Sequence, residues 1–122
     1  MITNDSNLGS LGNLWYNIPK HTEPNDCIII LDGDDWLYNQ FVFEKIMLKF
    51  MEGYLFMHGL YIEVPKNLLI DEGNYEKDIV SSKTYRKDRW RCTGLRIFHR
   101  KLWDNVKLTD IQNNDGEFYK FT

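Results

Sequence analysis

The chain is poor in several features that would point to particular classes of protein. Its 122 residues include only two cysteines, Cys27 and Cys92, and these do not form the Cys-x-x-Cys spacing of a redox or zinc motif. We expect both to be buried thiols, which suits a reducing compartment. The 15 basic residues are outnumbered by 18 acidic ones, so the basic excess of a nucleic-acid-binding protein is missing.

Long apolar runs are also missing. No stretch reaches the roughly 18 apolar residues that a membrane-spanning helix requires, so we expect no transmembrane segment. The first residues, Met1–Asp5, lack the basic and apolar regions of a signal peptide. These absences predict a cytoplasmic protein. The hydrophobic fraction of 43% and the aromatic fraction of 15% are typical of a packed globular domain.

The spacing of apolar residues predicts two long helices. The pattern i, i+3, i+4, i+7 indicates a helix over Leu8–Ile18, which we expect Pro19 to end. A more regular helix is expected over Asn39–Glu52, and Gly53 should end it. The residues expected to form the buried stripe of this second helix are Phe43, Ile46, Met47 and Phe50.

Short apolar runs between and after the helices predict strands. Cys27–Leu31 reads as a buried strand, and Tyr54–Ile62 as a strand covered on both faces. Lys77–Arg91 is expected to be a long loop, Leu95–Phe98 a third strand and Lys101–Leu108 a short helix. The order helix, strand, helix, strand indicates an α/β layered fold. Because so few strands are visible, we expect the whole chain to be one partial domain.

The most informative segment is the acidic turn, Asp32–Asp35, which directly follows the first predicted strand. It places three carboxylates within four positions, and carboxylates that close repel one another. A divalent cation that prefers oxygen ligands relieves this repulsion. In open α/β sheets, ligands bind beyond the carboxyl ends of the strands, where this turn lies. The sequence therefore predicts a metal site, formed by Asp32, Asp34 and Asp35, that holds a phosphorylated ligand.

An EF-hand loop or a helix cap accounts less well for the acidic turn. An EF-hand loop counted from Asp32 would need Gly and Glu where Leu37 and Phe43 stand. Capping of the next helix would need only one acidic residue. A phosphohydrolase with Asp32 as nucleophile stays open as an alternative, although Asp35 and Trp36 depart from its usual continuation. Two roles are open to Trp36, stacking on a sugar or packing beneath the turn, and we expect the second.

These residues resemble a known family. Leu31–Leu37 resembles the Asp-x-Asp segment of family 2 glycosyltransferases, which have the GT-A fold. Asn7–Leu14 resembles the Gly- and Asn-containing helix upstream of it. His58–Tyr61 and Leu95–Phe98 resemble a subgroup found in large viruses and some bacteria. The resemblance covers about residues 7–118 and implies a partial GT-A-like, Rossmann-related sheet with flanking helices.

The resemblance implies metal-dependent transfer of a sugar from a nucleotide sugar, expected to be a UDP-sugar, to a carbohydrate or protein acceptor. The metal would be Mn²⁺ or Mg²⁺, which offsets charge on the departing diphosphate. Carried over to this sequence, Asp32 contacts the ribose or the metal, Asp34 coordinates the metal, and Asp35 supplies a further oxygen. Asn13 and Arg96 are implied as nucleotide-binding residues.

The resemblance also implies segments that this sequence does not contain. The first nucleotide-binding strand should precede Asn7, and the general base should lie beyond Thr122, so no catalytic residue is assigned. We therefore expect weak activity from the chain alone. The alternatives are a non-catalytic nucleotide-binding fragment and one half of a split enzyme that a second chain completes. A viral protein of this type would work in the host cytoplasm.

Overall fold

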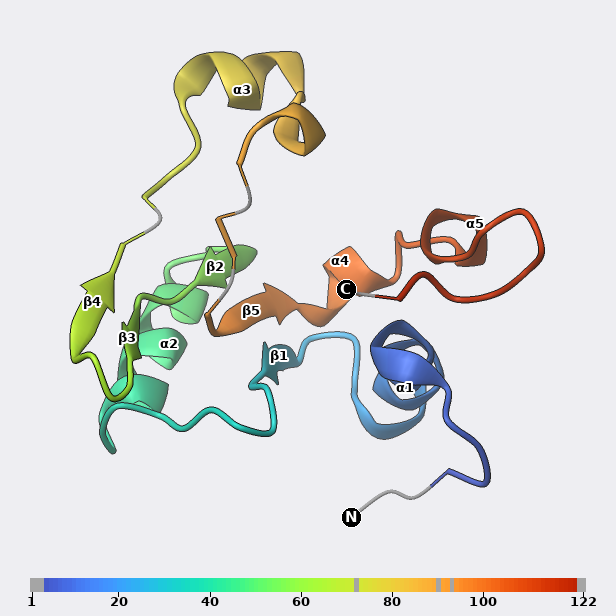
Figure 1. The fold of residues 1–122 in the computed structure, drawn as a ribbon, viewed down its shortest axis with the longest axis horizontal. Helices are drawn as coiled ribbons and strands as arrows, with labels where there is room; N and C mark the ends of the chain where they lie inside the picture. Colours follow the sequence, from blue (N-terminus) through green and yellow to red (C-terminus); the bar gives the residue numbers. More distant parts are fainter. Residues whose placement is uncertain (1–3, 72, 90, 93, 121–122) are drawn as a thin grey trace. The chain divides into compact units, whose positions relative to one another are not determined.

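The computed structural model describes residues 4–120 except residues 72, 90 and 93. The described chain is a mixed α/β structure, as predicted, and it forms two compact units. Unit 1 combines Met1–Asp26 with His99–Thr122, and unit 2 consists of Cys27–Phe98. Figure 1 shows the order of the elements along the chain, from the blue N-terminal helix to the red C-terminal segment.

Unit 1 begins with helix α1 (Gly9–His21). The side chain of Asn7 accepts a hydrogen bond of 2.9 Å from the first helical N–H, which helps to start the helix. The prediction that Pro19 ends the helix is wrong, because α1 continues through it for two more residues. Pro19 removes only one intrahelical hydrogen bond, the one to the carbonyl four residues earlier, and it stands in the last turn. The helix ends directly after this turn, where the Thr22 hydroxyl donates to the Ile18 carbonyl at 2.6 Å.

The C-terminal part of unit 1 contains two short helices, α4 (Arg100–Trp103) and α5 (Leu108–Ile111). The single helix predicted over Lys101–Leu108 is therefore wrong, since a break separates these two turns. After α5 the chain reverses, and Gln112 forms an antiparallel bridge with Phe118. The ring of Phe118 reaches α1, where it lies edge-on to the ring of Tyr16 at 6.0 Å.

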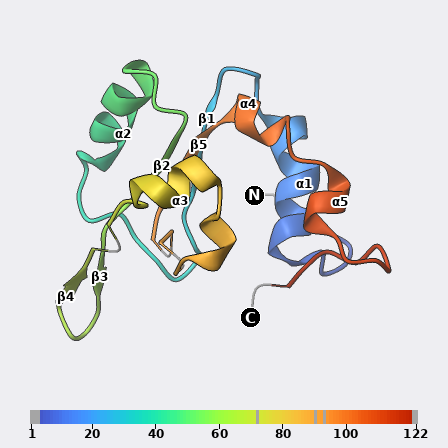
Figure 2. The same ribbon diagram turned by 90° about the horizontal axis from the view of Figure 1, so that it is seen from above.

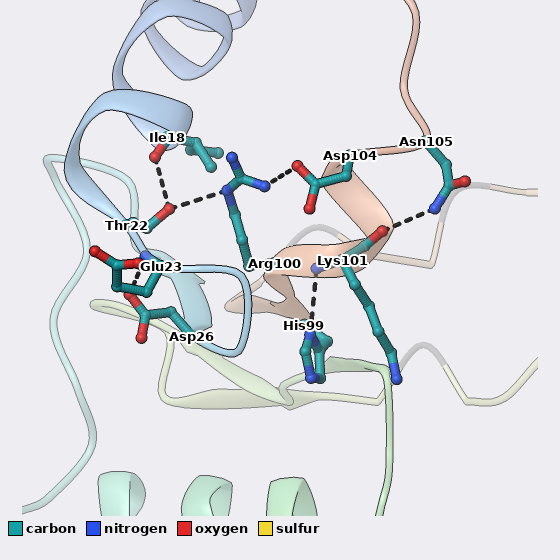
Figure 3. A network of polar contacts seen from close by, with 9 residues as sticks. All are labelled: Ile18, Thr22, Glu23, Asp26, His99, Arg100, Lys101, Asp104 and Asn105. Carbon is teal, nitrogen blue, oxygen red and sulfur yellow. Dashed lines mark hydrogen bonds and ion pairs between the residues drawn. The ribbon is translucent and has the colours of Figure 1, made fainter.

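A buried arginine joins the end of α1 to α4 (Figure 3). Arg100 is 7% exposed, and its Nε donates a hydrogen bond of 3.0 Å to the Thr22 hydroxyl. Its Nη1 donates to the carboxylate of Asp104, and its backbone N–H donates to the Asp26 carbonyl at 2.9 Å. The guanidinium thus has charged and polar partners in place of water, which is what allows it to be buried.

Unit 2 is built on a sheet with the strand order β1-β5-β2, formed by β1 (Cys27–Ile30), β5 (Arg96–His99) and β2 (Phe56–His58). The predicted first and third strands are confirmed as β1 and β5. Strand β2 runs antiparallel to β5, with His58 opposite Arg96. Buried Ile28 and Ile97 lie in the two neighbouring strands and belong to the small core.

The strand predicted over Tyr54–Ile62 is in fact two strands. Its first part is β2, which ends before Gly59. Its last part belongs to β3 (Tyr61–Glu63), which forms an antiparallel hairpin with β4 (Leu68–Ile70). The Gly59 N–H donates to the Leu95 carbonyl at 2.8 Å, so the chain leaves the sheet at a close backbone approach. Figure 2 shows this hairpin extending beyond the sheet. The expectation of burial on both faces is also wrong, because Phe56 is exposed.

Helix α2 (Val42–Met51) lies within the predicted range and ends, as predicted, before Gly53. Gly53 has a φ of +92°, a conformation in which glycine is favoured. The predicted stripe is only half right. Ile46 is buried and Phe50 half-buried, whereas Phe43 and Met47 are 52% and 44% exposed.

The segment expected to be a loop over Lys77–Arg91 contains regular structure. Helix α3 (Lys77–Ser82) is followed by the short 3₁₀ helix η1 (Tyr85–Lys87). Two serine hydroxyls bond back to the Asp78 carbonyl and support the turn of α3. A helix this short has too few positions to reveal an apolar period, which is why the sequence did not predict it.

Candidate functional site

The acidic turn directly follows β1 in unit 2. The Asp35 N–H donates to the Asp32 carbonyl at 3.1 Å, which closes the turn as predicted. Its three carboxylates are exposed to solvent. Gly33 does not have a positive φ and its Cα has open space around it, so the turn itself does not require glycine at this position.

The structure brings Asp32 together with Arg96, two residues that the sequence assigned to the nucleotide. They are 64 residues apart in the sequence and meet because β1 and β5 are neighbours in the sheet. The Nη2 of Arg96 donates to Oδ1 of Asp32 at 2.6 Å and to Oδ2 at 2.7 Å. The side chain of Asp32 is 52% exposed and that of Arg96 25%. The pair therefore lies at the surface, with the arginine as the more buried partner.

The other two carboxylates of the turn are placed differently. Among the residues that the structure describes, none forms a hydrogen bond or ion pair with the side chain of Asp34 or Asp35. Nor do the described residues include a group of three acidic, histidine or cysteine side chains placed to hold a metal ion. The repulsion that we expected a cation to relieve is relieved at Asp32 by Arg96.

The donors in this turn still suit a hard cation. Mg²⁺ and similar ions are commonly held by one or two carboxylates together with water and substrate phosphate oxygens. Asp34 and Asp35 can supply such carboxylates, because both are exposed and without competing partners in the described chain. The metal site predicted from Asp32, Asp34 and Asp35 thus stays a prediction, with Asp32 committed to Arg96 in this structure.

Arg96 also borders a hollow of about 950 Å³ in unit 2. Arg96 and His58 both line it, and each has a buried nitrogen without a hydrogen-bond partner in the described chain: Nε of Arg96 and Nδ1 of His58. These residues face each other across β5 and β2. The remaining lining is mostly apolar and aromatic, and it consists of Ile30, Tyr54, Phe56, Met57, Leu60, Asp71, Gly73, Asn74, Tyr75, Tyr85, Cys92 and Phe98.

One wall of this hollow is formed by two tyrosine rings, which contact each other and an arginine. The rings of Tyr75 and Tyr85 meet edge to face at 5.2 Å, and the guanidinium of Arg91 lies 5.4 Å from the Tyr75 ring. Burial raises the pKa of the Tyr75 phenol, and the neighbouring Cys92 thiol raises it further. Sequence reasoning missed Tyr75, because isolated tyrosines in an irregular segment carry no periodic signal.

Two further sequence predictions have different outcomes. Trp36, expected to pack beneath the acidic turn, is 69% exposed, so that prediction is wrong. Its indole is exposed to solvent and directly follows the exposed carboxylates in the sequence. Asn13 lies in α1 of unit 1, where its side-chain oxygen accepts a hydrogen bond from Asn4. Its assignment to the nucleotide stays a prediction.

Comparisons with models of known protein families, with curated protein sequences and with solved structures gave no match for this chain. None of the helices in the described residues is long and apolar enough to cross a membrane. Cys27 and Cys92 are both present as thiols, and burial raises the pKa of the Cys27 thiol.

Proposed function

We propose that this chain provides the nucleotide-sugar-binding part of a metal-dependent glycosyltransferase. The observation that carries the proposal is the juxtaposition of Arg96 with the acidic turn at the end of β1. A cationic side chain beside two carboxylates without partners suits a diphosphate and its divalent cation. The resemblance of Leu31–Leu37 to the Asp-x-Asp segment gives the same assignment from the sequence alone.

The proposal gives each residue a role. Asp34 and Asp35 would hold the cation, and the cation supplies positive charge that stabilises a departing diphosphate. Arg96 donates hydrogen bonds to a phosphate group, since its planar guanidinium matches phosphate oxygens. The exposed indole of Trp36 offers an apolar face to a base or sugar ring.

Hydrolysis of a phosphate ester through Asp32 has less support. A nucleophilic carboxylate needs an oxygen free to attack, and both oxygens of Asp32 accept hydrogen bonds from Arg96. A nucleotide-binding fragment without transferase activity would use the same residues. The two cases differ only in whether the bound sugar is transferred to an acceptor.

Replacing Asp34 tests the proposal directly. Isothermal titration of the full chain with UDP in the presence of Mn²⁺ should give saturable binding, and GDP should be titrated in parallel. Asp34→Asn keeps the shape of the side chain but removes a metal ligand, so the affinity for UDP with Mn²⁺ should fall by about tenfold or more. Chelation of Mn²⁺ should weaken binding by wild type and leave the variant little changed.

Asp115→Asn is the matched control. Asp115 also lies in an exposed turn, between Asn113 and Gly116 in unit 1, and it carries the same charge. This variant should bind UDP with Mn²⁺ as wild type does. If Asp34→Asn and Asp115→Asn both bind as wild type does, the acidic turn is not a metal-nucleotide site and the proposed function is wrong.

A further inference from the structure

The ion pair between Asp32 and Arg96 occupies the groups that the proposed ligand would need. Arg96 uses Nη2 for a carboxylate of its own chain, and Asp32 has both oxygens engaged. Resting on the proposed function, we infer that Arg96 is an exchange residue. It holds Asp32 when no ligand is present and transfers its hydrogen bonds to an anionic phosphate group when the ligand binds.

The geometry of the pair favours such an exchange. A single nitrogen of Arg96 serves both oxygens of Asp32, whereas the strongest arginine–carboxylate pairs use two nitrogens in parallel. The carboxylate is also half exposed to water, which screens the attraction. A diphosphate carries more negative charge than one carboxylate and can compete for the guanidinium.

The unused donor of Arg96 gives the exchange a driving force. Its Nε is buried without a hydrogen-bond partner in the described chain, and a buried donor left without an acceptor is unfavourable. The Nδ1 of His58, on the neighbouring strand, is in the same situation. Movement of the guanidinium toward a ligand with several acceptor oxygens would bring Nε to an acceptor and release Asp32.

Release of Asp32 would place a third carboxylate of the acidic turn at the disposal of the cation. The resting pair would thus keep the turn from acting as a three-carboxylate site until an anionic ligand arrives. This order of events predicts that Mn²⁺ and the nucleotide assist each other's binding, because the nucleotide frees a ligand for the metal.

A double-mutant cycle with UDP alone, in the presence of a chelator, tests the exchange. Asp32→Asn frees Arg96 in advance, so UDP should bind about fivefold more tightly than to wild type. Asp35→Asn is the matched control, because it removes the same charge from the same turn without freeing Arg96, and its gain should be smaller. In the double variant Asp32→Asn/Arg96→Gln, the gain in UDP affinity that depends on Arg96 should disappear.

Two results would overturn the inference. In the first, Asp32→Asn changes the affinity for UDP equally whether or not Arg96 is present. In the second, Asp32→Asn and Asp35→Asn raise the affinity for UDP equally. Either outcome would mean that only the net charge of the turn matters. If wild type binds UDP with Mn²⁺ and the cycle is additive, the exchange is wrong and the proposed function stands. If wild type binds no nucleotide with or without Mn²⁺, both are wrong.

A spectroscopic measurement covers the case in which Arg96→Gln fails to fold. The Nε–H of Arg96 should give its own ¹H–¹⁵N signal, assigned by its absence from Arg96→Lys. Addition of UDP to wild type should move this signal, since Nε gains an acceptor. A signal that stays in place while UDP binds would overturn the exchange.

Discussion

At the scale of single residues, the ion pair of Asp88 and Arg91 makes stability depend on pH. Hydrogen bonding from Arg91, whose Nε lies 2.8 Å from Oδ2 of Asp88, holds the pKa of the Asp88 carboxyl below its ordinary value, and a backbone hydrogen bond from Arg89 acts in the same direction. The pair belongs to the segment that carries Arg91 under the Tyr75 ring. Its loss should therefore loosen the aromatic wall of the hollow.

Asp88→Asn should lower the midpoint of thermal unfolding at pH 7. A carboxyl whose pKa is lowered by folding contributes stability above its unfolded pKa of about 3.9, and this contribution is lost as the pH falls through the folded value. The difference between wild type and variant should therefore shrink below about pH 4. Asp78→Asn in α3, where the carboxylate is exposed, is the control. A difference that persists unchanged at pH 2 would mean that the ion pair is not its cause.

The candidate site shows what a sequence can and cannot predict about single residues. The acidic turn is predictable, because three carboxylates after an apolar run are a local signal. The partner of Asp32 is not, since Arg96 lies 64 positions away and only the pairing of β1 with β5 brings it close. The prediction that Trp36 is buried is wrong, because an aromatic residue after a strand is buried only if another element covers it.

At the scale of elements, length decides how much the sequence can predict. α1 and α2 each span several turns, so their apolar periods are visible, and β1 and β5 are marked by short apolar runs. The break at Gly59 is not predictable in this way, because it depends on the close approach of the Leu95 carbonyl. α3 escapes prediction because a helix of six residues shows no clear period.

The contact between α1 and the C-terminal bridge yields a prediction for Gly12. A Cβ added there would lie 3.0 Å from the Cβ of Leu8 and 3.0 Å from Cδ2 of Phe118. At an uncrowded position inside a helix, replacing glycine by alanine raises the free energy of unfolding by about 1 kcal/mol. Here Gly12→Ala should bring no gain in the free energy of unfolding, because the crowding offsets the helix preference.

A double-mutant cycle that combines Gly12→Ala with Phe118→Leu separates the helix preference of alanine from the crowding by the Phe118 ring. Once the ring of Phe118 is gone, the contact with Leu8 remains, so Gly12→Ala should stabilise the chain, but by less than the roughly 1 kcal/mol of an uncrowded helix position. Urea unfolding of wild type, both single variants and the double variant measures the difference. A gain of the same size in the presence of the Phe118 ring would show that the ring does not restrict this position.

At the scale of the whole molecule, the small core makes the chain sensitive to its ligand. Among the described residues no large side chain is completely buried, and many apolar side chains of unit 2 are exposed. A chain with so little buried apolar area is expected to be only marginally stable. A ligand that binds the folded state alone then shifts the unfolding equilibrium measurably.

UDP and Mn²⁺ together, at about one hundred times their dissociation constant, should add about 2.7 kcal/mol to the free energy of unfolding. For a chain of this length that raises the midpoint of thermal unfolding by about 10 °C. Asp34→Asn should show a much smaller rise under the same conditions. Amide hydrogen exchange should locate the effect, with added protection at the acidic turn and at β5. A rise in the midpoint without protection at these two segments would place the nucleotide elsewhere, because in the proposed site the acidic turn holds the cation and Arg96 of β5 holds the phosphate.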